Sequence, residues 1–501
     1  MPSYFFVLAL ASTVFFFAYR PACIFSEADD FTRRRNLWLI LTLAAFFSPN
    51  FWVYAFIAAS LLVYTNRRES NPVALFFFIL FVVPDGFVQI PGIGLLEHLF
   101  VLSYPKILEL IILLPAFFFL RRQGDTPPFG RLWTDKILFG YLLLNVVLFT
   151  RDTSITNTVR HTFYLFTGVF LPYFVISRSL KNLPAFRDAL FSFVVTTMVL
   201  AIIALFEFGK FWLLYTDMLN TLELREAMTF YILRDGMLRV VSAAGHPIIL
   251  GFILVIGIGF YLFLQRSIPQ KFVRLLGLVL LVAGLIVSLS RGPWTGAAVL
   301  LIVFFAAGRN PVRRLMVSGF AALITFALLA VLPKGEKLLN LLPYIGTVDQ
   351  QNIEYRERLI TNSMIVIQRN PWFGSTTFLE TPEMEAMRQG EGIIDVVNSY
   401  LAITLGSGFV GLGLFVGFFT LTLLGIYHAM RSIPDKDSDE YLLGQTLLAT
   451  LLAILFTITT ASSILNAPLV YWSVAGIGVA YAQMILKNPG GNDRPSAAPH
   501  P

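Results

Sequence analysis

Long apolar stretches separated by short polar segments dominate this chain. A straight membrane-spanning helix needs about 20 apolar residues, and several of these stretches are somewhat shorter. They lie near residues 4–19, 37–48, 51–64, 71–83, 105–120, 133–150, 162–177, 189–209, 247–265, 275–290, 293–308, 315–332, 399–427, 441–463 and 468–486. The pattern predicts an all-α, polytopic transmembrane helical bundle of about 15 spans.

Composition and charge support a membrane protein. The 501 residues are 56% hydrophobic and 13% charged, whereas a soluble domain carries about 25% charged residues. The net charge of +7 is explained by Lys and Arg held on the cytoplasmic side, and no basic module points to nucleic acid. The single cysteine, Cys23, excludes an internal disulfide framework.

The short loops predict the orientation of the bundle. Placing the N-terminus outside puts Arg33–Arg35, Arg121–Arg122 and nearly every other short basic loop in the cytoplasm, as the positive-inside rule requires. The first apolar run, Tyr4 to Tyr19, has Arg20 after it and no basic residue before it. That polarity predicts a retained helix, not a cleavable signal peptide.

Two outer segments are longer than ordinary connectors, namely 210–246 and 333–398. Long loops in compact proteins are usually functional or disordered. Within the second, residues 354–370 have the spacing of an amphipathic helix that Pro371 stops. Near the N-terminus, the second and third apolar stretches flank Ser48-Pro49-Asn50 and predict either a tight hairpin or a partly re-entrant pair. The tail after Lys487 is rich in Pro, Gly and Ala and predicts disorder.

The candidate chemistry lies on the predicted outer face. Arg291 occupies the tight turn Ser288–Pro293, and Arg239 and His246 precede the ninth stretch, while Arg356 and Arg358 lie early in the loop helix. Guanidinium groups match phosphate oxygens bidentately, so converging arginines predict a phosphorylated ligand. The alternatives are ordinary: an arginine that snorkels to lipid headgroups, a solvated helix face for Arg356 and Arg358, and a structural His246.

Other chemistries lack their motifs. The chain has no Gly-rich loop ending in Lys-Ser/Thr, no His/Cys/carboxylate cluster with metal spacing, and no Asp-x-Asp pair on an outer loop. The run Asp435–Asp439 lacks the glycine of a calcium loop. We therefore expect no metal and no cofactor.

Several motifs together resemble the O-antigen ligase and O-antigen polymerase superfamily. They are Arg239 followed by Ala244-Gly245-His246-Pro247, the turn Ser288-Leu289-Ser290-Arg291-Gly292, Glu354–Arg358, Asn370-Pro371-Trp372-Phe373-Gly374, and Asn398–Leu401 followed by Gly408–Leu412. The resemblance covers roughly residues 67–487. It implies a twelve-span core preceded by about three extra spans.

This resemblance implies five regions of the chain. They are 1–66 (extra spans), 67–332 (nine core spans), 333–398 (a large, partly helical periplasmic loop), 399–487 (three last spans) and 488–501 (a cytoplasmic tail). It also implies a metal-independent inverting glycosyltransferase of the GT-C type in the bacterial inner membrane. The donor would be a glycan on undecaprenyl diphosphate and the acceptor a glycan or lipid-linked glycan, with a chain-length regulator as a further partner. Arg291 and Arg239 would contact the donor diphosphate.

One departure concerns the catalytic base. The ligase pattern has a histidine just before the loop-ending asparagine, whereas this chain has Val397 before Asn398. The remaining base candidates are Glu391 and Asp395, followed by Glu354 and Glu383, because a positioned carboxylate can accept the acceptor's proton. The change favours a polymerase or exopolysaccharide-assembly role over a lipid A-core ligase. The rival class is a transporter of lipid-linked oligosaccharides, which would place its ionisable residues near the bilayer midplane.

Overall fold

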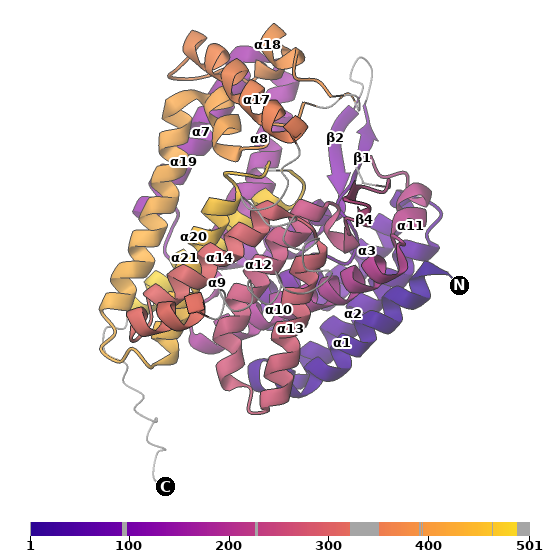
Figure 1. The fold of residues 1–501 in the computed structure, drawn as a ribbon, viewed down its shortest axis with the longest axis vertical. Coiled ribbons are helices and arrows are strands. Elements are labelled where there is room, and N and C mark those ends of the chain that lie inside the picture. The colour runs from indigo at the N-terminus through magenta and orange to yellow at the C-terminus, as the bar shows by residue number, and fades with distance from the viewer. Residues whose placement is uncertain are drawn as a thin grey trace.

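The computed structural model describes residues 2–92, 98–225, 229–320, 350–389, 392, 394–462 and 464–487. These residues form a helical bundle with a smaller helical unit at its upper end (Figure 1). The helices are α1 (Ser3–Phe25), α2 (Ala28–Phe47), α3 (Phe51–Asn66), α4 (Pro72–Ile79), α7 (Trp133–Asp152), α10 (Leu183–Lys210), α11 (Thr216–Thr221), α12 (Pro247–Leu264), α13 (Lys271–Val287), α14 (Arg291–Ala306), α17 (Gln350–Arg369), α18 (Pro382–Glu385), α19 (Ser399–Arg431), α20 (Asp439–Thr457) and α21 (Ala467–Lys487).

Two further helices are each interrupted by one π-helical turn. In one, α5 (Tyr104–Leu108) and α6 (Leu114–Arg122) flank the π-turn 109–113, and in the other, α8 (Ile155–Leu165) and α9 (Leu171–Ser179) flank the π-turn 166–170. Lys106 links the two turns, because its Nζ lies 3.1 Å from Glu109 Oε2 and 3.0 Å from Thr167 Oγ1. Pairing and hydrogen bonding offset the cost of these polar groups inside an apolar bundle.

Membrane spanning is supported by eight helices among the described residues that are long and apolar enough to cross a bilayer. They include α1, α7, α10, α12 and α19 through α21, as well as the combined helix Ile155–Ser179. The all-α, polytopic expectation is confirmed, whereas the count of about 15 spans stays a prediction. The stretch expected at 71–83 forms only the eight-residue α4, and most of the stretch 315–332 lies outside the described residues.

The all-α pattern did not predict two short antiparallel hairpins. β1 (Phe87–Pro91) pairs with β2 (His98–Ser103), and β3 (Leu233–Arg234) pairs with β4 (Met237–Leu238). Both lie in segments that connect apolar stretches. At the tip of the second hairpin, Asp235 and Gly236 have φ angles of 51° and 74°, as a two-residue type I′ turn requires. This second hairpin carries two arginines of the candidate site.

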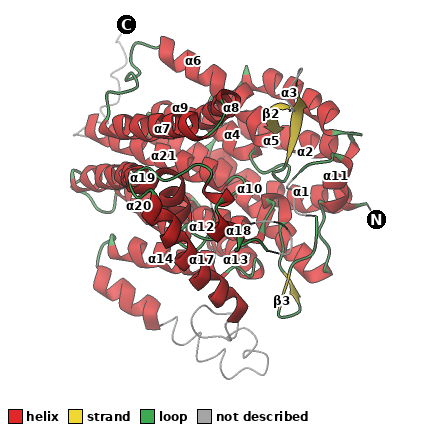
Figure 2. Cartoon of the chain, turned by 90° about the horizontal axis from the view of Figure 1, so that it is seen from above, coloured by secondary structure: helices red, strands yellow, loops and turns green. Residues whose placement is uncertain are grey.

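The upper unit has a small apolar core of its own. Leu359 and Val366 of α17, Met384 of α18, Val396 and Leu405 belong to this core, and Val397 packs against it. Residues 354–369 are helical as predicted, and the helix ends just before Asn370 and Pro371. Figure 2 shows the bundle from above, with α17 and α18 nearest the viewer. The described part of the long loop is therefore a folded unit that covers one end of the bundle.

A break in α19 joins this unit to the bundle. Gly408 has a φ of 65° and a ψ of −170° inside α19, a region that is essentially restricted to glycine and costs other residues about 1–3 kcal/mol. The backbone of the motif 370–374 fills the break: Phe409 N donates to Pro371 O (2.8 Å) and Val410 N to Trp372 O (3.1 Å). Two motifs that are far apart in sequence therefore form one backbone junction.

Candidate functional site

The turn between α13 and α14 forms the centre of the candidate site. Only Ser288, Leu289 and Ser290 separate the two helices, and Leu289 takes a left-handed φ of 49°. The Ser290 hydroxyl donates to Ser288 O (3.0 Å), and Trp294 Nε1 donates to Leu285 O (2.8 Å). These bonds hold Arg291 as the first residue of α14, where the helix dipole is positive.

Two arginines from the β3–β4 hairpin reach this turn. Arg239 Nη2 donates to Ser290 Oγ at 3.2 Å, and Arg234 donates to the carbonyl oxygen of Leu289. Arg239 and Arg291, which the sequence predicted to act together, therefore meet at one turn. Arg234 was missed, because only the hairpin register brings it to the same turn as Arg239.

Arg239 lies in an unusual environment for a cation. Desolvation by burial, and then the neighbouring charge of Arg234, lower the pKa of Arg239 to about 10. Its Nε is buried without a hydrogen-bond partner among the described residues. A buried donor on a cation costs free energy unless an acceptor meets it. The guanidinium therefore has unused capacity for an anion.

Glu207 anchors the segment that carries this hairpin. It is buried near the end of α10, and its carboxylate accepts hydrogen bonds from Leu214 N (3.0 Å), Val241 N (3.2 Å) and Ser242 N (2.9 Å). These bonds hold Ser242 in a left-handed conformation with a φ of 50°. The sequence did contain a signal for Glu207, namely a lone carboxylate inside the apolar stretch 189–209.

His246 caps α12. Its Nδ1 accepts a hydrogen bond from Ile248 N at 3.1 Å. Desolvation and then the charge of Arg239 lower the pKa of His246 to about 4, so the ring is neutral at pH 7. Because Nδ1 accepts, the neutral ring carries its proton on Nε2. The structural role is established, and a donor remains on the other side of the ring.

Three helices begin near this turn. Gly251 in the first turns of α12 lies against α14, because a β-carbon at Gly251 would come within 2.8 Å of the Pro293 ring. A β-carbon at Gly292 would lie 2.5 Å from Thr460 Oγ1, in the segment between α20 and α21. The first residue of α19, Ser399, bonds to the same segment: its N donates to Ile458 O (3.0 Å) and its Oγ to Ala461 O (2.9 Å). Positive helix ends from α12, α14 and α19 are thus gathered at one end of the bundle.

The predicted catalytic residues precede α19. Asn398 is the N-cap of α19, and its Oδ1 accepts from Tyr400 N (2.9 Å) and Leu401 N (3.2 Å). Asp395 accepts a hydrogen bond from the Ser462 hydroxyl, next to the segment that contacts Gly292 and Ser399. Glu391 lies outside the described residues. Of the predicted base candidates within the described residues, Asp395 is therefore the one that the fold ties to the turn.

The other predicted residues lie away from this turn. Arg356 and Arg358 are exposed on α17, where Arg358 makes a 3.4 Å hydrogen bond to Ala386 O. Glu354 is exposed, and Glu383 pairs with Arg369. These positions match the solvated-face alternative for α17. No group of three His, Cys, Asp or Glu residues that could hold a metal occurs within the described ranges.

A segment that contains the arginine turn matches a known protein family. Residues 276–416 match the family model described as O-antigen ligase. The matched segment runs from α13 through the long loop into α19, and it contains Arg291, Asp395, Asn398 and Gly408. The match confirms the resemblance to the O-antigen ligase and polymerase superfamily for this part of the chain. A comparison with curated proteins gave no match.

The family match has a functional implication at a coarse level. It implies glycan transfer of the ligase or polymerase type on lipid-linked substrates in a membrane. Together with the apolar helices, it supports a multi-pass bacterial membrane protein.

Proposed function

We propose that this protein is a metal-independent inverting glycosyltransferase of the bacterial inner membrane. It would transfer a glycan from undecaprenyl diphosphate to a glycan or lipid-linked glycan acceptor on the periplasmic side, in O-antigen, exopolysaccharide or capsule assembly. The observation that carries the proposal is the arginine-lined turn at residues 288–291, inside the segment that matches the O-antigen ligase family.

The diphosphate would lie against this turn. Arg239 supplies a charged donor whose Nε is buried and has no hydrogen-bond partner in the described part of the chain. Arg291 begins α14, and a helix N-terminus favours bound phosphate. His246 adds a neutral N–H donor. We propose that Arg239 and Arg291 are the main contacts, that His246 is an auxiliary one, and that Arg356 and Arg358 meet the sugar chain or solvent from α17.

The proposed glycan transfer would use these residues as follows. The acceptor hydroxyl oxygen attacks the anomeric carbon while the bond from that carbon to the diphosphate oxygen breaks, with inversion. The electron pair of the broken bond stays on undecaprenyl diphosphate, where the arginines stabilise the developing charge. The hydroxyl proton passes to a base on the protein. Arginine charge would thus do the work that a metal ion does in other glycosyltransferases.

Asp395 is the base that we favour. Its hydrogen bond to Ser462 links it to the segment that contacts the arginine turn and the start of α19. Val397, in the position of the family histidine, packs against the small core of the upper unit. Asn398 would position this segment through its cap. Glu391 remains an alternative base.

The regions predicted from the sequence define the proposed path of the donor. The donor would enter from the lipid between helices of the 67–332 core, and its sugar would lie beneath the 333–398 loop. The N-terminal region 1–66 would add spans outside the catalytic core. Because the chain lacks the ligase histidine, we favour glycan polymerisation over transfer to lipid A-core, with a chain-length regulator as partner.

Reconstitution with a lipid-diphosphate glycan tests the proposal. Purified protein in vesicles should lengthen or transfer the glycan in buffer that contains a metal chelator, and the product would be resolved by electrophoresis or mass spectrometry. The alternative, a transporter of lipid-linked oligosaccharides, predicts movement of the glycan across the vesicle membrane without a new bond. Movement without bond formation would overturn the enzyme assignment.

A further inference from the structure

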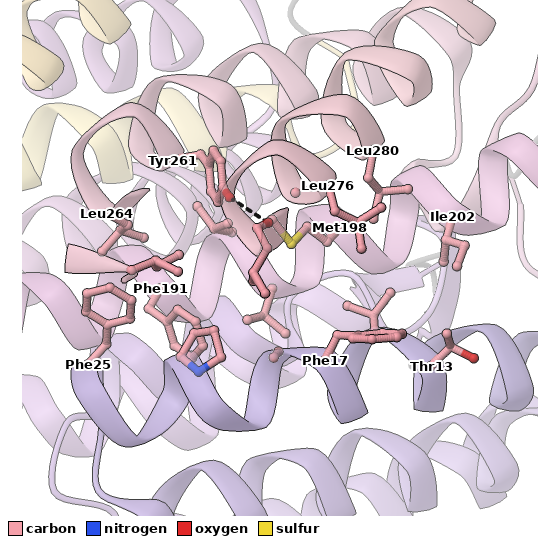
Figure 3. Close-up of a pocket in the computed structure, with 18 residues that line it drawn as sticks. Thr13, Phe17, Phe25, Phe191, Met198, Ile202, Tyr261, Leu264, Leu276 and Leu280 are labelled. Atoms are coloured by element: carbon pink, nitrogen blue, oxygen red, sulfur yellow. Dashed lines mark hydrogen bonds between the residues drawn. The ribbon is translucent and has the colours of Figure 1, made fainter. Parts of the chain in front are cut away.

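An apolar groove away from the arginine turn has the chemistry of a binding site for a hydrocarbon chain. It lies between α1, α10, α12 and α13, has a volume of about 250 Å³ and is lined almost entirely by apolar side chains (Figure 3). Its two hydroxyl groups are already used, because Thr13 donates to Ala9 O and Tyr261 to Arg274 O, both at 2.9 Å. Only an apolar chain can occupy such a lining without leaving polar groups unpaired.

The groove is accessible from the bilayer and has the length of one leaflet. Phe17 and Leu276 on its rim are 51% and 40% exposed. Along α1 it extends from Thr13 to Phe25, roughly 18 Å at 1.5 Å per residue. The hydrocarbon core of a bilayer is about 30 Å thick, so the groove fits an acyl chain from one leaflet.

A polar pocket continues the groove at its lower end. The groove ends at the rings of Phe25 and Phe191, whose centroids are 5.3 Å apart. Phe25 also lines a second cavity of about 400 Å³, together with Ser26, Glu27 and Asp188. Asp188 lies one helical turn from Phe191 on α10. The apolar groove and the polar pocket are therefore adjacent. They lie at the end of the bundle that the charge pattern assigns to the cytoplasm.

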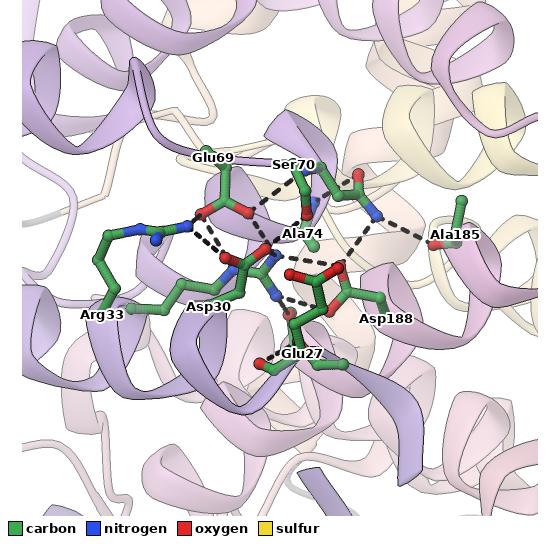
Figure 4. Close-up of polar contacts among 12 residues, drawn as sticks. Glu27, Asp30, Arg33, Glu69, Ser70, Ala74, Ala185 and Asp188 are labelled. Carbon is green, nitrogen blue, oxygen red and sulfur yellow. Dashed lines mark hydrogen bonds and ion pairs between the residues drawn. The ribbon is translucent and has the colours of Figure 1, made fainter. Parts of the chain in front are cut away.

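The wall of the polar pocket is acidic. Behind the pocket, three carboxylates pair with two guanidinium groups, so the cluster keeps one negative charge; its members are Asp30, Glu69, Asp188, Arg33 and Arg34 (Figure 4). The residues that line the pocket include the carboxylates of Asp188 and Glu27 and, within the described chain, neither Lys nor Arg. Glu27 is exposed and takes part in none of the ion pairs that the described residues form. Such a wall favours a cationic headgroup over an anionic one.

We propose that these two cavities bind one phospholipid with a primary ammonium headgroup, such as a phosphatidylethanolamine. Its acyl chain lies in the groove between α1 and α13, and its ammonium group meets Glu27 at the pocket mouth. The site is separate from the arginine turn and involves α1, one of the helices that precede the predicted glycosyltransferase core. It would therefore fasten the N-terminal helices to α10, α12 and α13 with a lipid.

Native mass spectrometry of the full chain tests this site. The protein is titrated with ethanolamine, glycerol and choline phospholipids that share the same acyl chains. We expect the ethanolamine lipid to give the most abundant adduct. Glu27→Gln should lower its affinity roughly two- to fivefold, the value of a partly exposed ion pair. The choline lipid should lose less, because its quaternary ammonium has no N–H to donate to the carboxylate. Ala18→Phe, which fills the groove, should remove adducts of all three lipids.

The control variant is Ala9→Phe, the same substitution at an exposed position of α1 outside the groove, which should keep wild-type adducts. Thermal stability of each variant in detergent reports whether it is folded, and Glu27→Gln tests the headgroup even if Ala18→Phe fails to fold. Equal binding of the three lipids, or a preference for the glycerol lipid, would overturn the headgroup assignment. Displacement by undecaprenyl phosphate at equal concentration would instead make the groove part of the donor site and overturn the proposal.

Discussion

Arg239 and Asp395 approach the same site from different parts of the chain. Arg239 comes from the β3–β4 hairpin, and Asp395 comes from the end of the long loop. The turn at 288–292 and the segment at 458–462 lie between them. Single substitutions can therefore test the two proposed roles separately: a charge that binds the donor diphosphate and a base that accepts the acceptor's proton.

Asp395→Asn should separate chemistry from binding. The amide keeps the size of the side chain and can still accept from Ser462, but it is a far weaker base. General-base catalysis typically contributes 10²–10⁴-fold, so kcat should fall by roughly that factor with little change in KM for the donor. Glu383→Gln, which alters an exposed carboxylate paired with Arg369, is the control. Near wild-type turnover in Asp395→Asn would transfer the role to Glu391 or another group.

His246 predicts a pH-dependent contribution to stability. Its pKa falls to about 4 in the folded protein from about 6.5 in an unfolded chain. The unfolded state binds more protons between these values, so this group lowers the free energy of unfolding as the pH falls from about 7 toward 4. His246→Asn keeps a capping acceptor and should flatten that slope, as measured by thermal unfolding in detergent from pH 7.5 to 4.5. The same slope in both proteins would contradict the assignment.

For individual site residues, the positions of charges in the sequence were more informative than hydrophobic periodicity. Arg239 and Arg291 could be paired from sequence because both border turns on the predicted outer face. Arg234 could not, since its approach depends on the hairpin register. Arg356 and Arg358 looked equivalent to the other arginines, but the apolar face of α17 turns inward onto Met384 and leaves them exposed.

Among the contacts between secondary-structure elements, the junction between α19 and the 370–374 motif matters most for the candidate site. α19 has 33 residues, roughly 50 Å at 1.5 Å per residue, which exceeds the thickness of a bilayer core. The break at Gly408 divides it into an upper part that packs against α17 and a lower part within the bundle. The position of the upper unit over the site therefore depends on one glycine.

Gly408→Ala should loosen the upper unit without unfolding the bundle. A β-carbon at this position would overlap the Trp372 backbone, and the residue has a positive φ. Hydrogen exchange of residues 354–389 should rise, and transfer activity should fall at least tenfold, because the loop no longer covers the site. Gly413→Ala is the matched control in the same helix, since nothing lies within 4 Å of its β-carbon position. Unchanged exchange in Gly408→Ala would show that the junction does not hold the unit.

The hydrophobic pattern predicted the long helices well. It failed for elements that are defined by backbone hydrogen bonds. Residues 48–50, for which the sequence left a tight hairpin or a partly re-entrant pair open, form a three-residue connection between α2 and α3, with Asn50 capping α3. The two β-hairpins and both π-turns escaped the apolar pattern, because their backbone bonds do not follow hydrophobic spacing. The Asn370–Gly374 and Gly408 motifs were recognised separately, and only the fold shows that they bond to each other.

For the whole molecule, the predicted orientation stays a prediction, and one end of the bundle bears on it. Arg34, which the sequence placed among cytoplasmic loop charges, is instead buried between Glu69 and Asp188. This network still lies at the end opposite the arginine turn, because α10 carries Asp188 near its start and Glu207 near its end. The orientation predicted from the positive-inside rule is therefore compatible with the fold, although Arg34 is buried in an ion-pair network and does not face the cytoplasm.

Cysteine accessibility tests the orientation directly. In a Cys23→Ser background, Arg369→Cys on α17 should react with a membrane-impermeant maleimide in intact spheroplasts. Lys436→Cys, between α19 and α20, should react only after permeabilisation. The two positions lie beyond opposite ends of α19, and single substitutions at exposed sites should leave stability nearly unchanged. The reverse pattern would place the arginine turn in the cytoplasm and contradict the periplasmic reaction.

The arginine turn is proposed to hold the diphosphate of a lipid-linked glycan donor. The most direct test of this proposal is the affinity of undecaprenyl diphosphate for the protein in nanodiscs, compared among wild type, Arg239→Gln, Arg291→Ala and the control Arg225→Gln. Arg225 lies in the same outer segment, and its side chain contacts Gln89. Losing a charged hydrogen bond should weaken binding roughly tenfold to a hundredfold in the first two variants, with no change in the control. Equal affinity in all four proteins would show that the arginine turn does not bind the diphosphate.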